Sequence, residues 1–393
     1  MKRIKVTPRD NWQEKVEKLG FDYHTVDPEK YGGGDSIYWV EDSIYQFSMD
    51  EINTIEAATN ELYSRCLDAV DYITRSRDLM NRCQIPEVYH DAIRRSWHRR
   101  DLDLYARFDL AFNPAIDPNP KMYEINADTP TSIFEGSIVQ WFWLEDSIKE
   151  GRIPRGSDQF NSMHERLIEA FKVIGKRYVH PNELFHFFSV SEHIEDEITV
   201  EYIRDTANQA GLNTKFGYME DIGWDGNRFV DYDNKPITTM FKLYPWEWMM
   251  REEFGPHMSE EVMDIVEPIW KSILSNKMLL PILHEMFPKH PNILPAADYV
   301  PVGVNYVKKP IFSREGANIT MVENGKQLIE TSGDYGSEGF IYQEMFPLPD
   351  FNGKHPVIGS WIIGGKACGM GIREDDSLVT KNTSHFIPHF IID

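Results

Sequence analysis

The chain has 393 residues, a formal net charge of −22, 41% hydrophobic residues and three cysteines. The acidic balance argues against nonspecific binding of nucleic acid or anionic membranes, which depends on Lys and Arg contacts to phosphates. Cys66, Cys83 and Cys368 show neither the paired spacing of a zinc site nor the density of a disulfide scaffold, and no stretch is long enough for an apolar membrane span. We expect a cytoplasmic, enzyme-sized protein with two or three packed lobes.

The first third of the chain predicts a helical scaffold. After a Gly32–Gly34 loop and a short strand at Tyr38 and Trp39, apolar residues recur at helical spacing over residues 50–77. A second helix is expected over residues 88–101. Its basic residues form a solvated face, and the alternative is that they border an acidic ligand.

Two short segments of alternating polarity follow, residues 105–112 and 122–127. Because neighbouring side chains of a strand face opposite sides, Arg107 and Asp109 share one face, as do Glu124 and Asn126. An antiparallel register that sets Asp109 opposite Glu124 also sets Arg107 opposite Asn126. Facing carboxylates repel one another, so a cation is needed to neutralise them. Arg107 would neutralise them only in part, and a divalent ion is the simpler explanation. The hairpin therefore predicts a site for a metal and a phosphate.

The middle of the chain predicts a strand, helix, strand unit. A helix over residues 135–148 is followed by a nearly continuous apolar strand over 183–190, a helix over 195–210 and a strand over 214–219. No glycine fingerprint follows the first strand, so a dinucleotide site is not expected there.

The last third alternates short strands with helices. We expect strands over residues 240–244, 306–312, 340–346 and 357–373, and helices over 246–254, 259–275 and 278–286. The chain is thus divided into a lobe with the hairpin, a strand-helix-strand lobe and a final α+β part, over residues 1–180, 181–236 and 237–393.

Two lysines on predicted strands are candidates for phosphate binding, Lys242 and Lys309. The alternative for each is an ordinary residue of an edge strand. Residues 313–318 follow the second lysine, and Gly316 would let the backbone of this loop approach a ligand. The alternative for the loop is a plain hairpin turn.

Later residues offer further ligand contacts. Gln343 or Glu344 would meet an adenine or a ribose at the end of an apolar strand, unless that strand only fills the core. Arg373, with Lys381 shortly after it, would contact a phosphate or a carboxylate. The alternative for Arg373 is an ion pair with Asp375.

Several motifs in this order resemble the ATP-dependent synthetase half of glutathionylspermidine synthase, and especially its stand-alone relatives described as acid–amine ligases. The motifs are RFD at 107–109, EINADTPT at 124–131, FKLYPWEW at 241–248, KKPIFSREGANI at 308–319 and GIREDDSLVTKNTS at 371–384. The resemblance implies a mixed α/β fold of ATP-grasp type, with the strand-helix-strand lobe as a smaller, pre-ATP-grasp-like part.

The resemblance also implies roles for the candidate residues. Asp109, Glu124 and Asn126 would bind Mg²⁺, Arg107 would contact the transferred phosphate, and Lys242 and Lys309 would hold the phosphates of ATP. Arg373 and Lys381 match the late basic positions of the family, so that Arg107 and Arg373 are the expected catalytic residues.

The implied reaction is the attack of a substrate carboxylate on the γ-phosphate of ATP, which gives an acyl phosphate that an amine converts to an amide. The acid would be a small carboxylic acid, for example a peptide such as glutathione, and the amine a cationic one such as a polyamine. The chain shows no Cys/His pattern of an amidase, so we expect no hydrolysis of the product. The rival functions are a non-catalytic ATP-binding sensor and a kinase for a small molecule.

Overall fold

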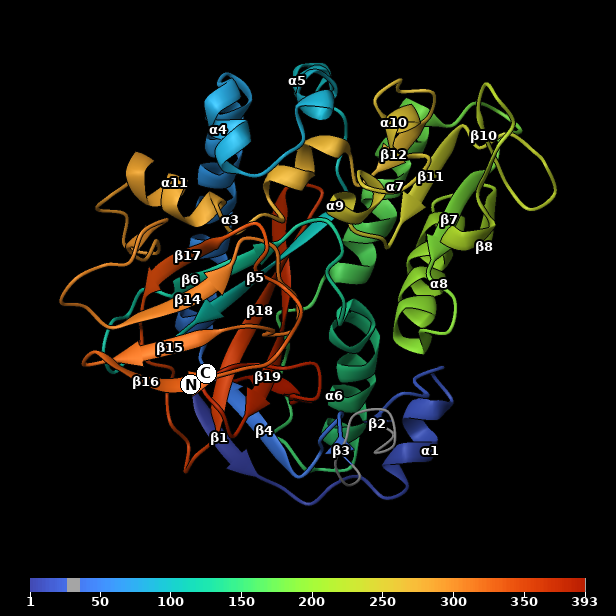
Figure 1. The fold of residues 1–393 in the computed structure, drawn as a ribbon. Coiled ribbons are helices and arrows are strands. Elements are labelled where there is room, and N and C mark those ends of the chain that lie inside the picture. Colours follow the sequence, from blue (N-terminus) through green and yellow to red (C-terminus); the bar gives the residue numbers. More distant parts are fainter. Residues whose placement is uncertain (27–35, 393) are drawn as a thin grey trace.

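Three sheets organise the part of the chain that the structure, a computed structural model, describes, namely residues 1–26 and 36–392 (Figure 1). The Gly32–Gly34 loop lies outside the described residues. Two of these sheets have five strands and the third has four, and smaller sheets lie beside them. No helix in the described ranges is long and apolar enough to cross a membrane.

The central sheet carries the predicted hairpin and has the strand order β20-β19-β18-β5-β6. Its strands are β5 (Tyr105–Ala111), β6 (Lys121–Asn126), β18 (His355–Ile363), β19 (Lys366–Asp375) and β20 (His385–Phe386). The expected register is confirmed, since Asp109 pairs with Glu124 and Arg107 with Asn126. A single strand over 357–373 is wrong, because the chain turns at Gly364 and Gly365, both with positive φ.

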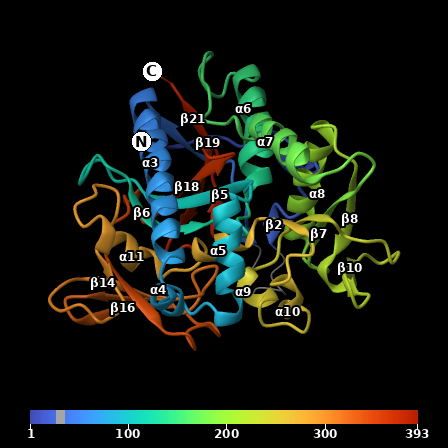
Figure 2. The same ribbon diagram turned by 90° about the horizontal axis from the view of Figure 1, so that it is seen from above.

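A long helix, α3 (Met49–Thr74), runs along this sheet, as Figure 2 shows from above. A capping box fixes its start, where Ser48 accepts from the backbone N–H of Glu51 and the Glu51 side chain accepts from Ser48. The helix buries an apolar stripe that includes Ile55 and Leu62. The helices expected over 50–77 and 88–101 are confirmed. Nearby helices are α4 (Arg77–Arg82), α5 (His90–Arg99) and α11 (Leu279–Met286).

The four-stranded sheet is parallel and has the order β12-β11-β7-β8. Its strands are β7 (Phe185–Ser189), β8 (Thr214–Tyr218), β11 (Thr239–Lys242) and β12 (Asp264–Val266), and its helices are α7 (Met163–Tyr178) and α8 (Ile194–Gln209). The strand-helix-strand unit is thereby confirmed. A helix over 259–275 is wrong, because β12 and the 3₁₀ helix Ile269–Ile273 occupy that segment. The local pattern did not reveal that β12 joins β11 as a neighbour.

The second five-stranded sheet has the order β13-β17-β14-β15-β16. Its strands are β13 (Ala296–Ala297), β14 (Tyr306–Pro310), β15 (Thr320–Glu323), β16 (Lys326–Glu330) and β17 (Phe340–Glu344). The helix expected over 246–254 is present only in its first part, as α9 (Trp246–Met249), and a second short helix, α10 (Gly255–Met258), begins just after the expected range.

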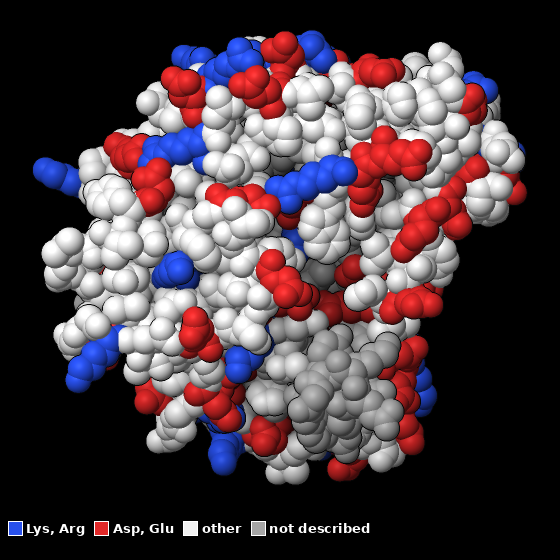
Figure 3. Space-filling model, in the orientation of Figure 1, with Lys and Arg blue, Asp and Glu red and all other residues white. Residues whose placement is uncertain are grey.

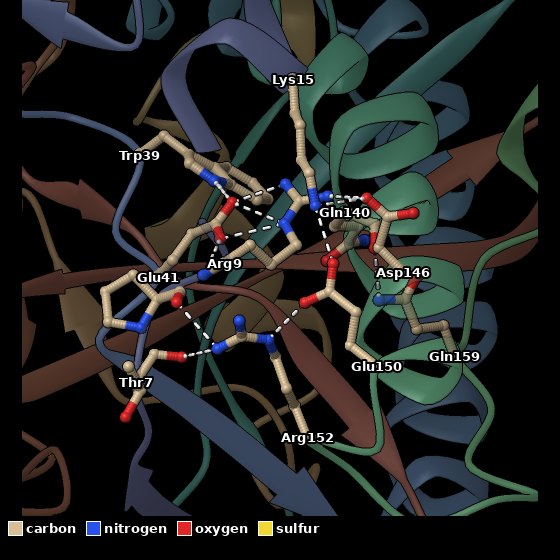
Figure 4. A network of polar contacts seen from close by, with 11 residues as sticks. Thr7, Arg9, Lys15, Trp39, Glu41, Gln140, Asp146, Glu150, Arg152 and Gln159 are labelled. Carbon is tan, nitrogen blue, oxygen red and sulfur yellow. Dashed lines mark hydrogen bonds and ion pairs between the residues drawn. The ribbon is translucent and has the colours of Figure 1, made fainter. Parts of the chain in front are cut away.

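The N-terminal segment is tied to the rest of the chain by polar contacts (Figure 4). The buried Arg9 donates to Glu41 and to Asp146, which lies on α6 (Gln140–Lys149). The π-helix Glu135–Val139 leads directly into α6, so the helix expected over 135–148 is present with an irregular first turn. The remaining elements are β1 (Lys2–Lys5), α1 (Trp12–Glu17), β2 (Thr25–Val26), β3 (Ser36–Ile37), β4 (Ser43–Phe47), the 3₁₀ helices Glu87–Tyr89 and Met219–Asp221, β9 (Gly223–Trp224), β10 (Phe229–Val230) and β21 (His389–Ile391).

Candidate active site

A cavity of about 1320 Å³ is lined by residues of both five-stranded sheets, of segments that directly follow strands of the four-stranded sheet, and of α8. Asp109 and Glu124 come from the hairpin, Lys309 from β14, Leu243 from just after β11 and Glu195 from α8. Small-molecule sites usually have volumes of ~300–1,000 Å³, so this cavity has room for a nucleotide and a second molecule. Figure 3 shows acidic side chains around a hollow near the middle of this face of the molecule.

Two cations neutralise the facing carboxylates of the hairpin. Nε of Arg107 lies 2.7 Å from Asp109 Oδ1, and Nζ of Lys277 lies 3.3 Å from Glu124 Oε2. Burial alone would raise the pKa of Glu124, but Lys277, Lys309 and Arg107 hold it below its ordinary value. Glu124 is therefore ionised at neutral pH. Sequence reasoning missed Lys277, because nothing in its local pattern indicates a position beside Glu124, which lies 153 residues earlier.

A glycine on the neighbouring strand makes room for Arg107. Gly359 lies opposite Asp109 on β18, and a Cβ atom there would lie 3.0 Å from Cδ of Arg107. The guanidinium also donates to the carbonyl of Thr131 over 2.9 Å. The side chain is thus held along the face of the sheet toward the cavity, which it lines.

Asn126 belongs to the turn that follows β6. Its Nδ2 donates to the carbonyl of Thr129 over 3.2 Å, and its Oδ1 accepts from the backbone N–H of Thr129 over 3.2 Å. Within residues 1–26 and 36–392, no three His, Cys, Asp or Glu side chains are grouped so as to hold a metal. Two carboxylates and one amide oxygen nevertheless fit Mg²⁺, which uses one or two carboxylates together with waters and substrate phosphates.

Lys242, a candidate for phosphate binding, lies away from the cavity. It is fully buried and does not line the cavity. Its Nζ donates to Asp128 and, over 2.8 Å, to the carbonyl of Tyr244, while Asp128 also accepts from the backbone N–H of Trp246. A contact between Lys242 and a phosphate stays a prediction.

Lys309 lies on the cavity wall. Its Nζ donates to the carbonyl of Tyr123 over 2.9 Å and to Oε1 of Gln343 over 2.8 Å. Gln343 is itself held by a bond from its Nε2 to the carbonyl of Met122, so its side chain positions Lys309. Burial lowers the pKa of Lys309 to about 8. Glu344, the next residue, is exposed and also lines the cavity.

The loop over residues 313–318 joins both sides of the cavity. The carbonyl of Ser313 accepts from Lys277, and Arg314 donates to Glu247 over 2.7 Å. Gly316 has a φ of +70°, and a Cβ atom there would lie 2.5 Å from the carbonyl oxygen of Thr380. This close approach of two backbone segments requires glycine.

The late basic residues border the same cavity. Arg373 donates to the carbonyls of Ser384, Lys381 and Asn382 over 2.9–3.0 Å. It makes these contacts in place of the alternative ion pair, since Asp375 accepts from the Ser384 hydroxyl. Lys381 lines the cavity with Arg373.

The opposite side of the cavity is acidic. Acidic residues that line it there include Glu192, Glu195, Asp196, Glu220, Glu247, Glu252 and Glu315. Burial, with the neighbouring charge of Glu195, raises the pKa of Asp196 to about 7. Sequence reasoning missed these residues, because acids in the first turn of a helix such as α8 are common for reasons of helix stability alone.

Comparison with known proteins supports a ligase of this architecture. The chain is 41% identical to a Haemophilus influenzae protein named "Putative acid–amine ligase", over 100% of both chains. It is 29% identical to trypanothione synthetase of Crithidia fasciculata, covering 83% of this chain and 53% of that one. For the bifunctional glutathionylspermidine synthetase/amidase of Escherichia coli the identity is 27%, covering 85% and 57%. The chain thus spans little more than half of the latter two proteins.

A solved structure supports the fold assignment. A glutathione synthetase-like effector from Globodera pallida superposes with a TM-score of 0.58 over 98% of each chain, at 9% identity. This similarity shows the ATP-grasp type of fold, as expected. The family model described as glutathionylspermidine synthase preATP-grasp matches residues 3–392. The chain therefore belongs to the glutathionylspermidine synthase family, whose named relatives are ligases and synthetases.

Proposed function

We propose that this chain joins a carboxylic acid to an amine, with ATP as the energy source and an acyl phosphate as the intermediate. The observation that carries the proposal is the hairpin pair Asp109 and Glu124, which faces a cavity of about 1320 Å³ among several cationic side chains. Membership of a ligase family supports the same reaction class. The carboxylate would attack the γ-phosphate, and the amine would then displace phosphate from the acyl group.

The hairpin would hold the metal. Asp109, Glu124 and Asn126 offer only oxygen ligands, the type that Mg²⁺ prefers. When bound, Mg²⁺ would neutralise charge on the β- and γ-phosphate oxygens and hold them in place. Asp109 would exchange its contact with Arg107 for the ion, and Glu124 its contact with Lys277.

The cationic side chains of the cavity would then serve the phosphates. Arg107 and Lys277 now contact the two carboxylates of the hairpin, and once released from them they would contact the transferred phosphate. Lys309 adds a third cation that is bonded only to neutral groups. Charges fixed before the reaction stabilise a transition state without reorganisation, and phosphoryl transfer depends mainly on this effect.

The acidic side of the cavity favours a cationic amine as the acceptor. Glu195, Asp196 and Glu315 line it, and α8 and the loop over 313–318 bring them together. A polyamine carries several ammonium groups and would be attracted by such a surface. One relative is named for glutathionylspermidine, so glutathione and spermidine are the first pair to test.

The test is a phosphate-release assay with Mg-ATP and pairs of candidate acids and amines, with products identified by mass spectrometry. We expect phosphate release only when an acid and an amine are both present, together with an amide product. Asp109→Ala should abolish turnover, whereas Asp68→Ala, an exposed acid on α3, is the matched control. A stable phosphorylated product would indicate a kinase instead, and ATP binding without turnover would indicate a sensor.

A further inference from the structure

A buried carboxylate lies directly behind the cavity wall. Glu135, the first residue of the π-helix Glu135–Val139, has no exposed surface. Its Oε1 accepts from the hydroxyl of Tyr38 over 2.7 Å, while its Oε2 has no hydrogen-bond partner. Tyr38 lines the cavity. Burying a carboxylate without a cation in contact with it is unfavourable, and buried polar atoms without a partner are rare and are often found at functional sites.

Tyr38 connects this carboxylate to the residues of the cavity. The Arg373 guanidinium lies over the Tyr38 ring, with Cζ 4.9 Å from the ring centre. Ser132 bridges the same groups, because its Oγ lies 3.2 Å from the Tyr38 hydroxyl and 3.4 Å from Nη1 of Arg373. Glu135 therefore reaches the cavity through the Tyr38 hydroxyl, and the hydroxyl of Tyr23, which also lines the cavity, lies close to the same carboxylate.

The charged and titratable groups around Glu135 come from three directions. They are Tyr23 and Tyr38 of the N-terminal segment, Glu195 of α8 and Arg373 of β19. Burial, with the charge of Glu195, raises the pKa of Glu135 to about 7. Burial also raises the pKa of the Tyr38 hydroxyl well above its ordinary value, so Tyr38 keeps its proton at neutral pH.

We propose that Glu135, acting through the Tyr38 hydroxyl, accepts the proton that the substrate ammonium must lose before it attacks the acyl phosphate. This inference rests on the proposed ligase function. An alkylammonium group has a pKa near 10, so about one amine in a thousand is unprotonated at pH 7. A base that titrates near the working pH is the most effective acceptor. Both the negative charge of Glu195, on the acidic side of the cavity, and the positive charge of Arg373 act on the Tyr38 hydroxyl.

The ammonium passes one proton to the oxygen of Tyr38, while the hydroxyl proton of Tyr38 moves to Oε1 of Glu135. The neutral nitrogen then forms a bond to the acyl carbon, and the bond from that carbon to the phosphate oxygen breaks. A second proton from nitrogen leaves with the phosphate as hydrogen phosphate, and the third stays on the amide. Tyr38 touches the amine, and Glu135 is the positioning residue behind it.

The variant Glu135→Gln tests the role, because the amide keeps the shape and still accepts from Tyr38. The probes are glutathione with spermidine and, in parallel, glutathione with hydroxylamine, which is largely unprotonated at neutral pH. With spermidine at pH 7 we expect kcat of the variant to fall by about 10²-fold, with KM little changed. The kcat should recover as the pH rises toward the pKa of the ammonium group, because the amine then loses its proton to water. With hydroxylamine the variant should stay within about threefold of wild type.

The control variants separate this role from a structural one. Tyr38→Phe keeps the ring beneath Arg373 and should reproduce the pattern of Glu135→Gln. Tyr63→Phe removes another buried hydroxyl, which donates to Asp103 outside the cavity, and should leave the activity with both amines unchanged. Equal losses with both amines, or no loss with spermidine, would overturn the proposal.

A measurement without substrates adds an independent readout. In infrared difference spectra of wild type minus Glu135→Gln, we expect a protonated carboxyl band that disappears with a midpoint near pH 7. A carboxylate that is ionised from pH 5 to 9 would overturn the role. A wild type that is inactive with every acid and amine overturns the ligase and this role together, whereas an active wild type and an unchanged variant overturn this role alone.

Discussion

The surroundings of two buried lysines differ in the charge of their partners. Lys242 of β11 donates to the carboxylate of Asp128, whereas Lys309 of β14 donates to a carbonyl and to the amide oxygen of Gln343. Both side chains are buried, but only Lys309 lines the cavity. The charge of Lys242 is therefore balanced inside the protein, and that of Lys309 is available to a ligand.

This difference explains how one kind of residue can serve stability at one place and binding at another. A buried ion pair must keep both partners, because removal of one leaves an uncompensated charge. Burial lowers the pKa of both lysines, but only Lys309 lacks a carboxylate in contact with its ammonium group, and an anion in the cavity would supply that charge.

Loss of Asp128 should have the largest effect on stability. Asp128→Ala leaves the ammonium of Lys242 buried without a counter-charge, and we expect the free energy of unfolding to fall by about 3–5 kcal/mol in denaturant titrations. The double variant Asp128→Asn with Lys242→Met removes both charges and should recover most of the loss. A fall below about 1 kcal/mol for the single variant would contradict the pairing.

Loss of Lys309 should affect turnover instead of folding. Lys309→Met keeps the length of the side chain but removes a charge beside the phosphates, so phosphate release should fall by about 10²–10³-fold. The unfolding midpoint in denaturant should be little changed, because Glu124 keeps its contact with Lys277 and is not left without a cation. Unchanged kinetics would show that Lys309 does not serve ATP.

The lowered pKa of Lys309 predicts a dependence on pH. Between the folded value of about 8 and the ordinary value of an unfolded lysine, the unfolded chain binds more protons, so stability rises with pH in this window. The same deprotonation weakens ATP binding, and we expect the dissociation constant to increase by about five- to tenfold from pH 7 to 9. Lys309→Met should show neither effect. Calorimetric titration with ATP and denaturant titration at each pH measure the two trends.

The smallest effect is expected for Gln343→Glu, which gives Lys309 a carboxylate partner and makes its surroundings resemble those of Lys242. The pKa of Lys309 should rise, and the pH dependence of ATP binding should move above the wild-type window. Affinity for ATP at pH 7 should fall by about fivefold, because the new carboxylate neutralises the lysine. Affinity equal to or above wild type would show that the neutral partner is not essential.

The hairpin could be predicted because its information is local. Alternation placed the polar side chains of each strand on one face, and the antiparallel register that sets Asp109 opposite Glu124 is the one observed. The apolar run of β7 and the apolar stripe of α3 can likewise be recognised within short stretches of the sequence.

The remaining features depend on contacts between distant segments. Strand β12 forms only because β11 offers it an edge, and Lys277 meets Glu124 from across the fold. The contact of Glu135 with Tyr38 could not be predicted either, because the two residues are 97 positions apart in the sequence. Sequence also could not separate Lys242 from Lys309, because the deciding residues, Asp128 and Gln343, lie on other elements.

The most direct test of the account is a crystal structure with Mg²⁺ and a non-hydrolysable ATP analogue. We expect Arg107 to leave Asp109, and the metal to lie about 2.1 Å from oxygens of Asp109, Glu124 and Asn126. Lys309 should then contact a phosphate of the nucleotide. A metal and nucleotide bound away from the hairpin, with the Arg107 and Asp109 pair intact, would contradict the account.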